Sequence, residues 1–186
     1  MHELLRRATS AQHRTLDHGL RYVLSPDLSA ARYGRLLAAL YGYYIPLEDA
    51  LAPLHTGTAV ALKRRAPLLE RDLRELGIEP ARVPLCDCPP LLANGDHLAG
   101  GFYVVEGACL GGQVIARAVR RQLGVRPAHG AAFFSGDGAR TGERWKAVVA
   151  WLEARERGAA HDIAEGALRT FSALARWLAQ RGVLDG

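Results

Sequence analysis

His13 and Arg6 are the polar side chains of the N-terminal region whose spacing suggests joint chemistry. Leu16 and Leu20 follow His13 at helical intervals, so we expect the imidazole to point inward. Arg6 lies two helical turns before His13, which is about 10 Å at 1.5 Å per residue. That distance resembles the span from the centre of a porphyrin to its propionates, so an imidazole could bind iron while a guanidinium pairs with a carboxylate. A histidine that only packs in the core is the alternative, and spacing alone favours it.

A second candidate site is the glycine-rich part of a long apolar stretch. Gly107, Gly111 and Gly112 are helix-weakening residues, each costing about 0.5–1 kcal/mol relative to alanine. Gly107 and Gly111 are four residues apart and share a face, which would let the backbone lie against a flat cofactor and let the helix bend. A tight crossing with another helix also favours small residues, and the segment does not decide between the two. The adjoining Glu106 could be a buried acid, but we expect it on the helix surface.

The remaining reactive side chains form no recognisable catalytic or metal motif. The chain has three cysteines, Cys86, Cys88 and Cys109. An odd number argues against a disulfide framework and fits a reducing compartment. Cys86 and Cys88 followed by His97 match no structural zinc spacing and lack a fourth ligand. We expect His97 to be solvated, near the end of an element. A nucleophile–base triad, a P-loop and a dinucleotide fingerprint are all missing.

The elements that must position these residues are predicted to be helices. The chain has 186 residues, of which 49% are hydrophobic, few valines and isoleucines, and hardly any alternating stretches, so we expect an all-α domain spanning residues 1–186. Ser29 is a candidate helix cap, Pro46 should kink its helix, and Phe133 and Phe134 should anchor a glycine-rich loop. Helical spacing predicts helices at about 2–20, 30–52, 59–76, 91–123, 141–156 and 160–181.

Charge and hydropathy restrict the partners and the compartment. The formal net charge is +5, carried by arginines spread over every segment, which suits a carboxylate-bearing ligand or an acidic protein. A clustered basic tail is missing, so we expect no nucleic-acid partner. The N-terminus has no apolar run of signal-peptide length, and no segment looks like a membrane span. We therefore expect a cytoplasmic protein without a membrane partner.

The order and spacing of several segments resemble the bacterial, biliverdin-producing heme oxygenase family. The resemblance covers most of the chain, although no single segment is specific by itself. The matching segments are LLR at 4–6 with QHRTL at 12–16, YGRLL at 33–37 with YIPLE at 44–48, GFYVVEG at 101–107 with LGGQ at 110–113, and FF at 133–134 followed by Gly136, Thr141-Gly142 and Trp145. The first pair resembles the family's proximal helix, and the segments around 101–113 resemble its distal helix.

This resemblance implies roles for particular residues. His13 matches the proximal heme ligand, and therefore the metal ligand. Arg6 stands where the family places a lysine or arginine against a propionate, and Tyr103 matches a tyrosine that contacts a propionate. The remaining propionate contacts have three candidates. They are Arg117, Arg120 and Arg121.

On the distal side, Gly107, Gly111 and Gly112 match the glycines whose backbone borders bound oxygen. One departure concerns the position after the first of these glycines, where some members carry an aspartate that organises a water network. This chain has Ala108 there, so distal waters would be held mainly by backbone groups.

The resemblance also implies a fold and a reaction. The fold would be a helical bundle with heme sandwiched between the first helix and the glycine-bent distal helix. The reaction would cleave heme at a meso carbon with O2 and external electrons, giving biliverdin, iron and CO, so that heme is both cofactor and substrate. The chain has no flavin or NAD motif and would need a separate reductase or ferredoxin-like donor, which its basic surface would suit if that donor is acidic. Iron acquisition and biliverdin supply to a bacteriophytochrome are both open as the purpose.

Two other functions stay open. The first is a heme-binding protein that stores or delivers heme without degrading it, which the Ala108 departure allows. The second is a helical interaction protein without heme, in which His13 belongs to the core and the glycines pack helices.

Overall fold

The computed structural model describes residues 1–54 and 60–185, and within them the fold is built from helices joined by short turns. The only β pairing among these residues is a pair of isolated bridges at 126–130. The predicted all-α class is therefore confirmed. The α-helices are α1 (His2–Ala8), α2 (Ser10–Gly19), α3 (Ala30–Leu51), α4 (Ala66–Glu75), α5 (Gly95–Leu123), α6 (Ala132–Ser135), α7 (Thr141–Glu153) and α8 (Ala160–Gln180).

The three largest differences from the predicted helix boundaries are at the starts or middles of helices, and the helix predicted at 141–156 also ends earlier, at Glu153. The helix expected at 2–20 is divided at Thr9, whose hydroxyl donates to the Leu5 carbonyl at 2.8 Å. The helix expected from residue 59 begins at Ala66, and its predicted start lies outside the described residues. The distal helix begins at Gly95 instead of residue 91, because the Asn94 side chain accepts the first free backbone N–H groups there.

Helix α3 shows how the chain accommodates a proline inside a helix. Ser29 caps it as predicted, since its hydroxyl accepts the Arg32 N–H at 3.2 Å. Pro46 lacks the N–H that would bond the carbonyl four residues earlier, at Gly42. The Cys86 N–H donates to that Gly42 carbonyl instead, at 2.9 Å, and α3 continues to Leu51.

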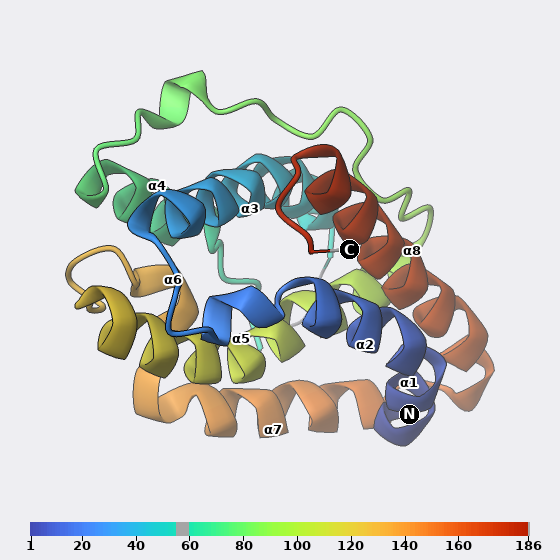
Figure 1. The fold of residues 1–186 in the computed structure, drawn as a ribbon. Helices are drawn as coiled ribbons and strands as arrows, with labels where there is room; N and C mark the ends of the chain where they lie inside the picture. The colour runs from blue at the N-terminus through green and yellow to red at the C-terminus, as the bar shows by residue number, and fades with distance from the viewer. Residues whose placement is uncertain (55–59, 186) are drawn as a thin grey trace.

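Helices α5 and α8 cross at very short range. A Cβ on Gly100 would collide with the Ile163 carbonyl, and a Cβ on Gly166 would collide with the His97 carbonyl. Backbone therefore lies directly on backbone at this crossing, which only glycine allows. In Figure 1, α7 runs along the lower edge of the molecule and α8 down the right side, while α5 lies above α7 and partly behind α2.

Helix α5 is the core helix of the described residues. Phe102 and Val105 on it are almost fully buried in one contiguous hydrophobic cluster. By length and composition α5 could also cross a membrane, contrary to the expectation that no segment would qualify, yet 56% of its most apolar window is buried inside the protein. A core helix of a folded bundle meets the same criteria, and the contacts of α5 with α6, α7 and α8 place it in that class.

Candidate functional site

A cavity of about 630 Å³ opens between the α1–α2 pair and α5, with α3 and α8 closing its sides. This volume is within the range of about 300–1,000 Å³ that is typical of small-molecule sites. Its walls are mainly aliphatic and aromatic, so the cavity suits a large apolar ligand. All six residues predicted for the site lie on its wall: Arg6, His13, Tyr103, Gly107, Gly111 and Gly112.

His13 borders the cavity from α2, with its ring set edge-on to Phe171 at a centroid distance of 6.0 Å. Its side chain is 62% exposed, so His13 is not a histidine that only packs in the core. Its Nδ1 donates to the Asp17 carboxylate at 2.8 Å. That bond assigns the ring proton to Nδ1 and leaves the lone pair of Nε2 free to bind a metal.

Asp17 is a functional candidate that the sequence reasoning missed. It lies one helical turn after His13 on the same face of α2 and also lines the cavity. A carboxylate that accepts a hydrogen bond from the non-ligating ring N–H of a ligating histidine orients the imidazole and raises its basicity. The signal in the sequence that could have identified Asp17 is its position four residues after His13.

Arg6, Thr9 and Tyr103 gather at one part of the cavity wall. The Arg6 side chain is 66% exposed and makes two hydrogen bonds to the Glu3 carboxylate, at 2.9 and 3.0 Å. Burial raises the pKa of Tyr103, against the opposing effects of Thr9 and of the Arg6 charge. Tyr103 therefore keeps its proton near neutral pH and can donate a hydrogen bond into the cavity.

The cationic side chains on the wall are Arg6 and Arg14. Arg14 directly follows His13, is exposed, and was not among the predicted propionate contacts. The candidates named for that role were Arg117, Arg120 and Arg121, and none of them lines the cavity. A second arginine directly after His13 was a signal in the sequence that the spacing argument did not use.

Gly107 and Gly111 present α5 to the cavity with little covering. A Cβ on Gly107 would meet the Trp145 ring at 3.4 Å, whereas a Cβ on Gly111 would have no neighbour within 4 Å. Gly112 lies against α6, where its Cβ would stand 3.0 Å from the Phe134 carbonyl oxygen. A tight helix crossing therefore does not explain Gly107 or Gly111. Their missing side chains instead leave room for a flat ligand.

Glu106 lies behind these glycines and is buried, so its predicted place on the helix surface is wrong. Arg144 donates to both of its carboxylate oxygens at 2.6 Å, and Arg65 lies 3.6 Å away. Asp137 pairs with Arg65 at 2.9 Å. This cluster joins α5 to α7 and to the neighbouring loops. Burial without these partners would be prohibitive for a carboxylate.

Asp72 is a second buried carboxylate that sequence reasoning did not single out. It is fully buried on α4 and accepts the backbone N–H groups of Ala132 and Phe133, both at 2.8 Å. It thereby satisfies the free donors at the start of α6. Phe133 and Phe134 are held in the cavity wall by this contact.

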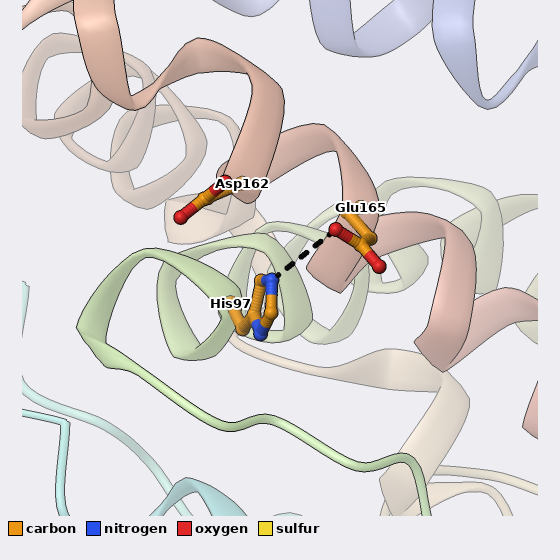
Figure 2. A group of neighbouring side chains, drawn as sticks. All are labelled: His97, Asp162 and Glu165. Atoms are coloured by element: carbon orange, nitrogen blue, oxygen red, sulfur yellow. Dashed lines mark ion pairs between the residues drawn. The ribbon is translucent and has the colours of Figure 1, made fainter.

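Elsewhere in the described residues, His97, Asp162 and Glu165 lie close enough to bind a metal ion, but the protonation of His97 does not suit a metal ligand. Figure 2 shows His97 of α5 facing Asp162 and Glu165 of α8, with candidate ligand atoms within 4.8 Å of one another. The Nδ1 of His97 accepts the Ala93 N–H at 3.2 Å, so the ring proton sits on Nε2, which faces Glu165 at 3.5 Å. A protonated nitrogen cannot ligate a metal. His97 is nevertheless buried, contrary to the expectation that it is solvated.

Comparison with known proteins finds relatives of this chain in sequence and in fold. No family model matches the chain. A heme oxygenase of Xanthomonas campestris pv. campestris (strain 8004) is 39% identical over 131 residues, which are 69% of this chain and 72% of that protein.

Two solved structures share the fold. The NO- and CO-bound heme oxygenase of Neisseria meningitidis has a TM-score of 0.82 at 22% identity and covers 98% of this chain and 92% of its own. A heme complex of a heme oxygenase from the cyanobacterium Synechocystis sp. PCC6803 has a TM-score of 0.72 at 17% identity, over 95% of this chain and 89% of its own. Because the sequence likeness to the Xanthomonas protein extends over two thirds of both chains, this chain belongs to the heme oxygenase family.

Proposed function

We propose that this protein binds heme in the cavity, where His13 would hold its iron, and cleaves it at a meso carbon with O2 and external electrons to give biliverdin, iron and CO. The observation that carries the proposal is one cavity in which His13, oriented by Asp17, lies on the wall opposite the open glycines of α5. When bound, heme supplies the redox chemistry and the oxygen-binding metal.

The residues of α2 would hold the heme iron on one side of the cavity. His13 presents the Nε2 lone pair, while Asp17 accepts a hydrogen bond from the Nδ1–H and keeps the imidazole in that tautomer. The edge of Phe171 beside the imidazole limits its rotation. Together these contacts orient the ligand before heme enters.

Arg6, Arg14 and Tyr103 are suited to hold the two propionates. Arginine pairs with a carboxylate through two parallel hydrogen bonds, and the protonated Tyr103 can donate a third. Arg6 would have to leave Glu3, but an exposed pair is screened by solvent and contributes little. These contacts would set the rotation of the ring in its plane, and with it the meso carbon that is attacked.

Gly107, Gly111 and Gly112 would border the reacting face. Their backbone leaves space beside the ring, and Ala108 on the same wall has only a methyl group. The apolar side chains of α3 and α8 exclude bulk water from the remainder of the cavity. This chain would therefore place the few waters that deliver protons mainly through backbone groups of α5.

The electrons would come from a separate ferredoxin- or reductase-type protein, and an acidic donor would be attracted by the net charge of +5. A cytoplasmic location is supported by three free cysteines, which are typical of a reducing compartment. Transfer of biliverdin to a bacteriophytochrome is one possible purpose, and release of iron is the other.

The decisive experiment is an absorbance time course of the protein with one equivalent of hemin, in air, after ascorbate is added. We expect a Soret band that forms and then decays while a broad red absorption of biliverdin grows. A Soret band that persists would instead indicate a heme carrier, and a missing Soret band would indicate a helical protein without heme.

The matched variants are His13→Ala and His18→Ala, two histidines of the same helix. His18 is exposed and does not line the cavity, and it contacts Arg21. We expect His13→Ala to lose the Soret band of the histidine-bound species while His18→Ala behaves as wild type. Equal behaviour of the two variants would overturn the assignment of His13.

A further inference from the structure

The chain turns back after α8 and runs to the end of α2 (Figure 1). Gly182 makes this turn with a φ of 62°, and the Val183 N–H closes it by donating to the Leu178 carbonyl at 3.1 Å. Val183 is buried in the core cluster, so the segment that follows is rooted in the fold. We call residues 183–185 the C-terminal strap. The function proposed above gives the C-terminal strap no role.

The C-terminal strap holds the last residue of α2, which is Gly19. The Asp185 N–H donates to the Gly19 carbonyl at 2.9 Å, and so satisfies one of the acceptors that a helix leaves free at its C-terminal end. The Leu184 side chain packs on the same residue, because a Cβ on Gly19 would stand 3.0 Å from its Cδ2 and 3.2 Å from its Cβ. The end of α2 is therefore held by a hydrogen bond and by a close packing contact.

An ion pair fastens the C-terminal strap to α3. The Asp185 carboxylate pairs with Arg32, which lies in the first turn of α3. The Arg32 guanidinium lies 3.6 Å from the centroid of the Tyr22 ring, and Tyr22 is a buried residue shortly after α2. The partner of Asp185 is thus held by the segment that leaves α2, and the ion pair closes around the end of that helix.

The helix held in this way is a wall of the cavity. Leu16 and Asp17 line the cavity from the last turn of α2, and Leu20 lines it from the residue that follows Gly19. His13, on the same helix, is the residue proposed to hold the heme iron. Helix α2 packs against α8, while α5 lies across the cavity from it. Because the cavity leaves one side of α2 without packing, the contacts at its end contribute to its position.

The ion pair is of a kind that opens readily. The side chains of Arg32 and Asp185 are 39% and 32% exposed, so both reach water. A pair with this exposure is screened by solvent and is weak compared with a buried pair. Opening it would leave the C-terminal strap on α2 by one backbone hydrogen bond and one packing contact.

We propose that Asp185 is a positioning residue of the heme site: through the C-terminal strap it holds α2 against the cavity, and opening of its pair with Arg32 speeds both the entry and the release of heme. The part that concerns heme rests on the proposed function, whereas the hold on α2 does not. Motions of this kind, in which a segment at the edge of a site opens and closes, control the passage of ligands in many enzymes.

A purely structural role for the C-terminal strap has a different signature. If the strap only stabilised the heme-bound arrangement, losing the ion pair would speed the release of heme and leave its entry unchanged. If the strap restrains the movement of α2, losing the ion pair speeds both steps. The two rates together therefore separate the proposal from simple stabilisation.

The first test needs no heme and measures amide hydrogen exchange in the ligand-free protein. We expect Asp185→Asn to exchange about threefold faster than wild type in peptides covering residues 14–20, because α2 opens more often once the charge is lost. Asp185→Glu keeps the charge and should stay close to wild type. Asp27→Asn, which changes an exposed acid outside the cavity lining, is the matched control and should behave as wild type.

Three results of this test would overturn the hold on α2. They are unchanged exchange in Asp185→Asn, an equal increase in every peptide of the chain, and an effect of Asp185→Glu as large as that of Asp185→Asn.

The second test measures hemin uptake by stopped flow and hemin release by transfer to an excess of apomyoglobin. We expect both rates to be about threefold faster in Asp185→Asn than in wild type. Added salt should reduce this difference, because it screens the ion pair that only wild type has. Faster release with unchanged uptake would overturn the proposed control of entry, and equal rates in both proteins would overturn the link to the cavity.

The two tests fail for different reasons. A protein that takes up no hemin would overturn both the proposed function and the control of heme passage, but the exchange result would still decide whether the C-terminal strap holds α2. Unchanged exchange together with normal hemin binding would overturn the strap and leave the proposed function in place.

Discussion

His13 illustrates how much a single functional residue depends on its neighbour within the same helix. Its Nδ1 donates to Asp17 at 2.8 Å, and both side chains are exposed on the cavity side of α2. Side chains four residues apart on a helix, such as these two, lie next to each other. The carboxylate in turn decides which ring nitrogen is free, so the pair behaves as one unit.

Replacing Asp17 by alanine tests this dependence. We expect the affinity for hemin to fall by about 10–100-fold, because the imidazole loses the acceptor that orients it and raises its basicity. A hemin titration followed at the Soret band measures the effect. Asp27→Ala, an exposed acid outside the cavity lining, is the control and should bind as wild type. Unchanged affinity in Asp17→Ala would show that Asp17 does not support the ligand.

At the scale of elements, α5 uses its glycines for two different purposes. Gly100 lets the α5 backbone lie on the α8 backbone, whereas Gly111 leaves a surface that faces the cavity. Both purposes need a missing side chain, but only the first is about helix packing. The sequence shows the glycines without separating these uses, because what lies opposite each one depends on another helix.

Alanine at Gly111 and at Gly112 should have opposite effects on stability. Gly111→Ala should raise the free energy of unfolding by about 0.5–1 kcal/mol through helix propensity, since nothing lies within 4 Å of the added methyl. It should also weaken hemin binding, because the methyl enters the cavity. Gly112→Ala should lower the free energy of unfolding, because its methyl would press on the Phe134 carbonyl, which α6 holds in place. Urea unfolding measures both, and equal stabilisation would contradict the geometry.

At the scale of the whole molecule, a buried charge cluster connects segments that are far apart in the sequence. Arg65 precedes α4, Glu106 lies in α5, Asp137 precedes α7 and Arg144 lies in α7. Burial alone would raise the pKa of Asp137, but hydrogen bonds from Arg65 and Lys63 outweigh it and lower the pKa to about 2. The folded state therefore favours the charged form of this carboxylate.

The pH dependence of stability should report this cluster. The pKa of Asp137 falls from 3.8 to about 2 on folding, so its contribution is complete above about pH 4 and is lost as the pH falls toward 2. Asp137→Asn should unfold about 1–3 kcal/mol more easily at pH 7, where the buried Arg65 loses a charged partner. Urea unfolding from pH 7 to pH 3 should show this difference shrinking with decreasing pH. A constant difference would show that the Asp137 charge does not contribute.

The sequence by itself determined the helical class, the cap at Ser29, the candidate residues His13, Arg6, Tyr103 and the glycines, and the family resemblance. These features depend on residue type and on spacing along one helix, which are local. The family and the fold class are confirmed by the comparisons, and the roles of the site residues stay predictions.

Only the tertiary structure decided which distant groups meet. Glu106 was predicted at the surface, yet Arg144 reaches it from 38 residues away and makes its burial possible. Asp72 caps a short helix 60 residues later, and the Cys86 N–H donates to the Gly42 carbonyl that Pro46 leaves free. Periodicity carries no information about such partners, because a buried polar group is stable only when a specific partner from elsewhere in the chain satisfies it.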